Sequence, residues 1–249
     1  MSIRSFSLLL LSGFLFISCT DKEENFAEMS VEELYNRAID RFDKGAYVKS
    51  AKAFAEVERQ HPYSNWAVKA QLMSAFSYYQ AKKYDDAIEG FRVFVQLHPS
   101  HEQVPYAYYM IGMCYYEQIP TTQRDQKPTV ESQNAFKEVV ERYSQSPYAK
   151  DAKYKLDLIQ DHLASKEMEV ARYYLDQGSH LAALNRYKSI VETYQTTSYI
   201  PEALHRMVEC YLSLGIREQA EAASAVLGHN YPDNKWYKAS YALLNSSKK

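Results

Sequence analysis

One stretch of the chain, residues 68–99, restricts the possible fold more than any other. It reads VKAQLMSAFSYYQAKKYDDAIEGFRVFVQLHP. Apolar side chains recur every three or four residues over 72–79 and again over 87–95, which predicts two helices that each bury one stripe. The stretch 82–86 places basic before acidic side chains, as suits the carbonyl end of one helix and the amide end of the next. Pro99 cannot continue the second helix. The stretch therefore predicts a helix–turn–helix hairpin.

This hairpin resembles a tetratricopeptide repeat, a unit of about 34 residues that buries its apolar face only when stacked in an array. Ala75 and Ala87 fall on its small positions, which let two helix axes approach to about 8–10 Å, and Phe91 falls on its large position. The other units carry equivalent landmarks at Leu34, Ala38, Phe54 and Pro62; at Gly112, Tyr115, Ala135 and Pro147; at Ala171, Tyr174, Ala183 and Tyr187; and at Leu204, Tyr211, Ala220 and Pro232.

We therefore predict an all-α fold, a solenoid of about five helical hairpins with a C-terminal capping helix at 233–244. Units 1–3 are expected in residues 31–147, with a polar insertion at 119–130 of the kind that often maps to a binding face. Units 4–5 and the capping helix are expected in 148–249. Surplus helix-forming sequence before the fourth unit predicts an extended helix at 148–177, either as one helix of about 30 residues or as two with a kink near Ser165.

The N-terminus predicts export and lipidation. Arg4 precedes an apolar run at 6–17 that is too short to cross about 30 Å of hydrocarbon comfortably, so residues 1–18 are read as a signal peptide. The sequence FISC at 16–19 resembles a bacterial lipobox, which implies a lipidated Cys19 followed by a flexible tether over 19–30. Thr20 stands where Asp would retain a lipoprotein in the inner membrane, which favours the outer membrane. A plain secretory signal and a short anchor are the alternatives.

The sequence offers little chemistry. Its seven His are scattered, and His61, His98 and His229 lie near helix ends without a second His one turn on, so neither a metal nor another cofactor is expected. The formal charge of −2, without a basic cluster, does not favour nucleic-acid binding. Cys114 and Cys210 occupy the same position of two different units, on the order of 30 Å apart, so we expect two buried free thiols. We predict that the protein is not an enzyme.

The lipobox, the tether and the lengthened unit SPYAKDAKYKLDLIQDHLASKEMEVARYYLDQGSHLAALNRY at 146–187 together resemble the BamD family, lipoproteins of the outer-membrane β-barrel assembly machinery. The resemblance implies a non-catalytic scaffold, lipid-anchored on the periplasmic face of the outer membrane. It also implies C-terminal repeats that dock on the periplasmic domains of BamA, N-terminal repeats that hold unfolded barrel precursors, and other lipoproteins of the complex as neighbours.

The resemblance also suggests site residues. Asn185 and Arg186 match a family stretch near the BamA interface, although an exposed, solvated Arg186 is an equal alternative. Surplus aromatic residues suggest a groove for extended precursor segments, and the candidates are Tyr63, Trp66, Tyr79 and Tyr106. Trp66 has the alternative of packing between repeats. Two other functions stay open at this point: a different periplasmic repeat adaptor for envelope or cell-division coordination, and an enzyme accessory subunit or a hydrolase with an unrecognised site.

Overall fold

The fold is built from helices alone over the part of the chain that the structure describes. The computed structural model describes residues 29–122 and 124–246, so the expected signal peptide and Cys19 lie outside the described residues. The described residues form eleven helices and no strand: α1 (Val31–Asp43), α2 (Tyr47–Gln60), α3 (Asn65–Gln80), α4 (Tyr84–Leu97), α5 (Val104–Tyr116), α6 (Lys127–Arg142), α7 (Ala149–Asp176), α8 (His180–Thr193), α9 (Ile200–Ser213), α10 (Arg217–Asn230) and α11 (Lys235–Ser246). The all-α prediction is confirmed.

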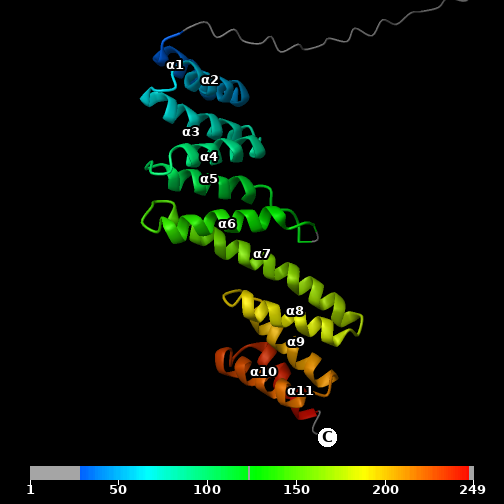
Figure 1. The fold of residues 1–249 in the computed structure, drawn as a ribbon. Helices are drawn as coiled ribbons and strands as arrows, with labels where there is room; N and C mark the ends of the chain where they lie inside the picture. The colour runs from blue at the N-terminus through cyan, green and yellow to red at the C-terminus, as the bar shows by residue number, and fades with distance from the viewer. Residues whose placement is uncertain (1–28, 123, 247–249) are drawn as a thin grey trace, which may run out of the picture.

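Consecutive helices pair as antiparallel hairpins and stack into one elongated array (Figure 1). The pairs are α1–α2, α3–α4, α5–α6, α7–α8 and α9–α10, and each also packs on the next pair. The last helix, α11, packs on α9 and α10 and covers the C-terminal end of the stack. The predicted solenoid with a capping helix is therefore the fold that forms.

The hydrophobic core is distributed along the stack rather than gathered at one centre. One cluster joins Leu34, Phe54 and Ala70 from α1, α2 and α3. Another joins Phe136 of α6 to Ile159 of α7. Each cluster thus takes side chains from neighbouring hairpins, so a single hairpin would leave its apolar face in water.

Small residues lie where two helices cross most closely. A Cβ placed on Gly112 of α5 would stand 2.7 Å from the ring of Phe136 on α6, closer than real Cβ contacts come. Ser50, where alanine is the usual residue, is fully buried, and its Oγ donates to the Ala38 carbonyl oxygen at 2.8 Å. The hydroxyl thus fits the crossing because it finds a backbone acceptor.

Four of the five hairpin turns share one geometry. At the end of α3, the Lys82 amide donates to the Tyr79 carbonyl oxygen and the Lys83 amide to the Tyr78 carbonyl oxygen, both at 2.9 Å, which is a Schellman motif. Its central residue has a left-handed backbone, with φ of 73° at Gly45, 71° at Gly178 and 75° at Gly215. Lys82 occupies the same place with φ of 57°.

The junctions between hairpins are equally regular. Each even-numbered helix from α2 to α10 ends at a capping residue with φ between −117° and −138° and ψ between 42° and 56°. These capping residues are His61, His98, Tyr143, Tyr194 and Tyr231. The backbone therefore takes nearly the same local conformation at the end of every hairpin.

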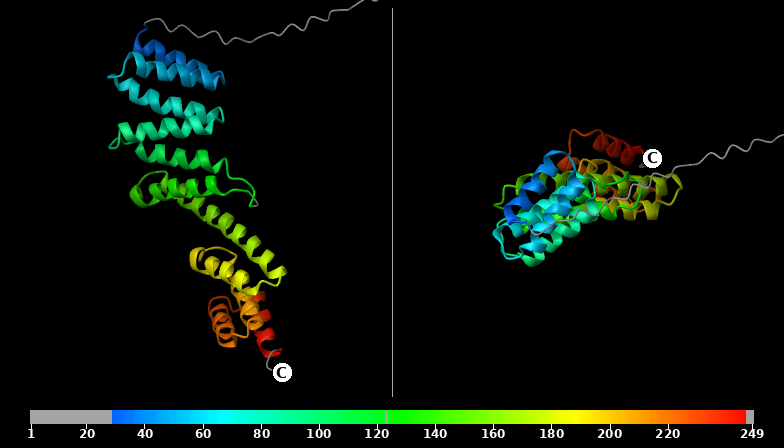
Figure 2. Two further views of the ribbon diagram at one scale, coloured as in Figure 1. Left: turned by 45° about the vertical axis from the view of Figure 1, so that its right-hand side comes forward. Right: turned by 90° about the horizontal axis from the view of Figure 1, so that it is seen from above.

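The longest helix, α7, links the two halves of the stack. It is a single helix of 28 residues that continues through Ser165, which decides between the two alternatives that the sequence left open. Figure 2 shows α7 running from the N-terminal hairpins to the C-terminal ones, which lie offset from the first stack. Within the expected insertion, residues 127–130 form the first turn of α6, where Pro128 needs no amide hydrogen, and only the residues before them connect α5 to α6.

Candidate binding surfaces

Aromatic side chains of α4, α5 and the residue before α7 form the first candidate surface. Tyr106 lies edge-on to Phe91 at 6.1 Å and tilts onto Tyr148 at 5.4 Å between ring centroids. Tyr109 stacks on the same Tyr148 at 5.4 Å, and its hydroxyl donates to Oδ2 of Asp151 at 2.7 Å. These rings form one continuous cluster that joins the second, third and fourth hairpins.

Burial sets the ionisation of this cluster. It raises the pKa of the Tyr106 phenol above its ordinary value, and neighbouring phenols act in the same direction. The pKa of Tyr109 is raised by burial and by its hydrogen bond to the Asp151 carboxylate. Both hydroxyls are therefore neutral at physiological pH and can serve as hydrogen-bond partners on an aromatic surface.

The structure brings together only two of the four predicted groove residues. Tyr79 and Tyr106 pack against the same hydrophobic cluster of α3 to α6. Tyr63 lies in the turn before α3 and is fully exposed. Trp66 packs on Tyr35 of α1 at 4.7 Å, so it joins the first two hairpins, as the alternative reading of this residue proposed.

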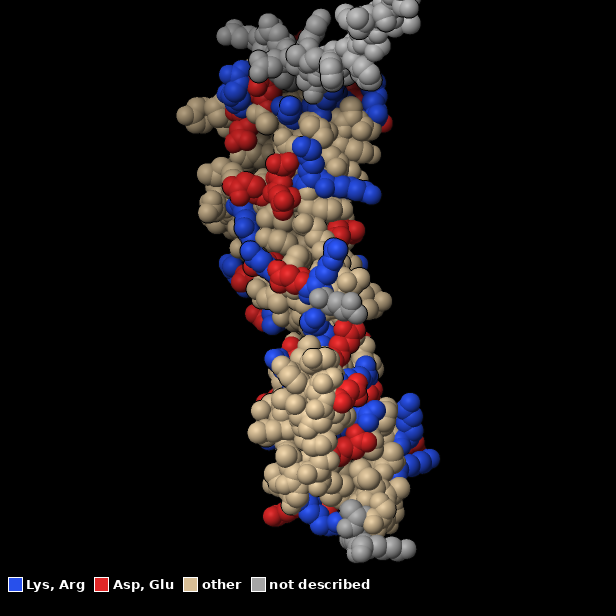
Figure 3. Space-filling model, turned by 90° about the vertical axis from the view of Figure 1, so that its right-hand side faces the viewer, with Lys and Arg blue, Asp and Glu red and all other residues tan. Residues whose placement is uncertain are grey.

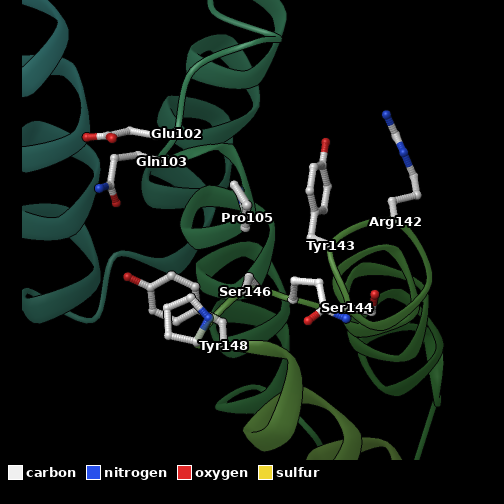
Figure 4. A pocket seen from close by; sticks show the side chains of 10 residues that line it. Glu102, Gln103, Pro105, Arg142, Tyr143, Ser144, Ser146 and Tyr148 are labelled. Carbon is white, nitrogen blue, oxygen red and sulfur yellow. The ribbon is translucent and has the colours of Figure 1, made fainter.

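A surface pocket of about 500 Å³ opens beside the aromatic cluster (Figure 4). It lies between the start of α5 and the connection from α6 to α7, where Pro105, Tyr143 and Tyr148 face it from the two sides. Glu102 and Arg142 stand at opposite sides of it. Sequence reasoning missed this pocket because its lining comes from two segments about forty residues apart, and the one available signal was the recurrence of proline next to tyrosine at both.

The second candidate surface is an uncharged face on the C-terminal hairpins. A shallow hollow of about 570 Å³ is lined by the turn from α7 to α8, the start of α8, and Leu214. Leu181, at 61% exposure, and Ile216, at 43%, present apolar side chains to solvent at the same two turns. Figure 3 shows the contrast: charged side chains are interspersed over the upper half of this side, whereas the lower half carries a broad uncharged area. We call the hollow, together with the exposed side chains of Leu181 and Ile216, the turn face.

Both interface candidates lie on α8, the helix that begins at the turn face. Asn185 is exposed and lines the hollow. Arg186, next to it, donates through Nη1 to Oε2 of Glu167 on α7 at 3.1 Å. Because both side chains of this ion pair contact solvent, it stabilises the fold by about 1 kcal/mol or less and can be exchanged for a partner's carboxylate.

A polar network joins α7 to α9 in the C-terminal hairpins. Arg172 of α7 binds Glu202 of α9 through two hydrogen bonds of 2.8 and 3.1 Å. On the same helix, Glu209 accepts from Arg206 at 2.8 Å and pairs with His205 at 3.4 Å. Although burial raises the carboxyl pKa of Glu209, these two hydrogen bonds outweigh it and hold that pKa below its ordinary value.

In the described part of the chain, no group of three or more His, Cys, Asp or Glu could hold a metal ion. Cys114 and Cys210 are free and buried, as predicted, and burial raises the pKa of their thiols to about 12 and about 11. None of the described helices has both the length and the apolar composition that crossing a membrane requires.

The sequence of the chain matches a known protein family. The family model described as "YfiO: Outer membrane lipoprotein" matches residues 27–227. The outer membrane protein assembly factor BamD of Caulobacter vibrioides is 43% identical over 222 residues, which are 89% of this chain and 73% of that protein. BamD of Rickettsia prowazekii is 37% identical over 241 residues, 96% of each chain.

Two solved structures align with most of this chain. The TPR domain of P58(IPK) aligns over 86% of this chain and 55% of its own, with a TM-score of 0.45 and 16% identity. MamA aligns over 80% of this chain and 90% of its own, with a TM-score of 0.40 and 18% identity.

Proposed function

Because the chain belongs to the BamD family of outer membrane lipoproteins, we propose that it is an outer membrane protein assembly factor that acts as a non-catalytic scaffold. In this proposal the lipid on Cys19 holds it on the periplasmic face of the outer membrane. Its C-terminal repeats dock on the periplasmic domains of BamA, beside other lipoproteins of the complex, and its N-terminal repeats hold unfolded barrel precursors. Replacing Cys19 with Ser should abolish metabolic labelling with a fatty acid, and persistent labelling would refute the anchor.

The turn face is the observation that carries the docking proposal. Monomeric proteins seldom leave several large apolar side chains grouped on an uncharged surface unless a partner covers them. Leu181 and Ile216 supply apolar area, Asn185 supplies hydrogen bonds, and Arg186 supplies a charge that its weak pair with Glu167 can release. An interface needs this combination of an apolar centre and a polar rim.

The docking experiment compares two exposed leucines. Leu181→Glu places a charge in the turn face, whereas Leu97→Glu makes the same change at a 58% exposed leucine of α4. We expect Leu181→Glu to weaken recovery of BamA from detergent-solubilised membranes at least about tenfold, since burying an unpaired carboxylate costs more than 1.4 kcal/mol. Leu97→Glu should leave recovery unchanged. Equal recovery with both variants would exclude the turn face as the docking site.

The role of Arg186 can be separated from its pair inside the molecule. Arg186→Glu should lower BamA recovery, but it also places two carboxylates side by side on α7 and α8. The exchange Arg186→Glu with Glu167→Arg restores the internal pair with reversed charges. If the exchanged protein still fails to recover BamA, Arg186 contacts the partner; if recovery returns, Arg186 serves only the fold.

Support for precursor binding comes from the aromatic surface around Tyr79 and Tyr106. Aromatic rings with neutral hydroxyls can bind extended segments of varied sequence, because each ring offers a large apolar area and loses little conformational entropy on binding. A photoreactive phenylalanine analogue at Tyr79 should capture a radiolabelled barrel precursor. The same probe at Tyr241, a 60% exposed tyrosine of α11, should not. Capture at both positions with equal yield would contradict the proposal.

A further inference from the structure

The long helix α7 has its two ends in different parts of the stack. Its first half buries Leu156 and Ile159 against α6. Its second half buries Met168 and Ala171 in the cluster of α8 to α11. Because units of a solenoid contact mainly their neighbours, the angle between the N-terminal and C-terminal hairpins depends on how firmly α7 is held along its length.

One connection of the N-terminal half reaches across to the far half of α7. Thr122, in the connection from α5 to α6, donates through Oγ1 to Oε1 of Glu169 at 2.8 Å. Ile119, in the same connection, packs with the cluster of α6 and α7 and lines a small cavity with Leu158 and His162 of α7. A hydrogen bond from a hydroxyl to a carboxylate is stronger than one between neutral groups.

A connection of the C-terminal half reaches back in the opposite direction. Thr196, between α8 and α9, donates through Oγ1 to Oε1 of Gln160 in the first half of α7, at 3.0 Å. Tyr194, at the end of α8, packs against the cluster that contains Phe136 and Leu156. The two threonine contacts therefore cross: each part of the stack binds the half of α7 that packs mainly on the other part.

We propose that these two contacts are crossed ties that fix the direction of α7 and so set the angle between the first three hairpins and the last two. The residues expected as a polar insertion then serve, through Thr122 and Ile119, to hold the molecule's shape. An unsupported helix of this length could swing about either of its packed ends, whereas two ties of opposite direction resist movement in both senses. The proposal concerns the shape alone and holds whatever binds to the two surfaces.

Pulsed electron resonance between two spin labels tests the ties. The labels are placed on exposed residues of the two parts, Glu89→Cys on α4 and Ala225→Cys on α10, in the full chain with its three native cysteines replaced by alanine or serine. The parent should give a narrow distance distribution. Thr122→Val with Thr196→Val should broaden it, because loss of a hydrogen bond to a carboxylate raises the population of displaced orientations at least about tenfold.

Matched variants separate the ties from general damage. Thr121→Val alters the neighbouring exposed threonine and should leave the distribution narrow. Glu169→Gln keeps a neutral acceptor for the Thr122 hydroxyl and should broaden the distribution less than Glu169→Leu, which removes the acceptor. Should a threonine variant lose helix content by circular dichroism, the comparison of Gln with Leu at position 169 decides. An unchanged distribution in the double threonine variant and in Glu169→Leu would overturn the proposal, as would equal broadening by Thr121→Val.

Discussion

Lys82 occupies a backbone position that glycine fills in the three equivalent turns. Its φ is 57°, close to the 71–75° of the glycines, and the same two Schellman hydrogen bonds close the turn. The lysine side chain is exposed, and the ion pair in this turn, at 3.9 Å, is made by Lys83 with Asp86. Lys82→Gly should therefore relieve backbone strain without removing packing.

The magnitude follows from two opposing terms. A left-handed backbone costs a residue with a Cβ about 1–2 kcal/mol. Glycine returns part of this gain, about 0.4–1 kcal/mol, because it makes the unfolded chain more flexible. We expect Lys82→Gly to raise the free energy of unfolding by about 0.5–1 kcal/mol, and Tm by about 2–3 °C for a chain of this size.

Urea unfolding followed by circular dichroism measures this gain, together with two controls. Lys82→Ala removes the charge but keeps the Cβ, so it should not stabilise the protein. Gly178→Ala places a Cβ at φ of 71°, where no neighbouring atom lies within 4 Å, so it isolates backbone strain and should destabilise by about 1 kcal/mol. The strain argument is refuted if Lys82→Gly leaves the midpoint unchanged or lowers it, or if Lys82→Ala stabilises equally.

Three further predictions concern the core, the acid limit and the thiols. Gly112→Ala should destabilise the protein by about 1–3 kcal/mol, measured by urea unfolding, because the added Cβ meets a fully buried Phe136 ring that has no room to move; an unchanged midpoint would contradict the close crossing. Glu209 has a carboxyl pKa below its ordinary 4.5, so its contribution to stability is complete above pH 4.5 and is lost as the pH falls through the lower folded value. Glu209→Gln should thus weaken the loss of stability below pH 4.5 in acid unfolding curves. If the curves of the two proteins coincide below pH 4.5, the Glu209 carboxylate does not contribute to acid unfolding. Cys114 and Cys210, with thiol pKa values of about 12 and about 11, should react with a chromogenic disulfide reagent at pH 8 only as fast as the chain opens, and fast reaction of the folded protein would refute their burial.

Local pattern was enough to predict the architecture. Apolar spacing, small residues and stop prolines determine each hairpin from within its own sequence, and stacking follows because no hairpin can bury its stripe alone. The long helix could be predicted for the same reason, since helix-forming sequence runs without a break through Ser165. The prediction of free thiols held because equivalent positions in separate repeats are necessarily far apart.

Features formed by the connections between repeats could not be predicted from the sequence. The pocket beside Tyr148 arises from two connections that meet only after the hairpins stack. Aromatic residues at helical spacing do not reveal which side of the stack they face, so Trp66 joins two hairpins while Tyr79 and Tyr106 lie in a different cluster. Lys82 gave no signal of its left-handed backbone, because the turn imposes that geometry through hydrogen bonds to α3.

The backbone conformation that recurs at the end of each hairpin has a consequence for how such proteins change length. Since the same backbone angles recur at the capping residues of the five even-numbered helices, the last turn of one unit has the same local geometry as the last turn of another. A duplication or loss of one complete unit among the first three would therefore meet the same cap geometry at the new junction. The length of the scaffold could thus change by one complete hairpin at a time. A change at α7 would also alter the angle between the N-terminal and C-terminal hairpins.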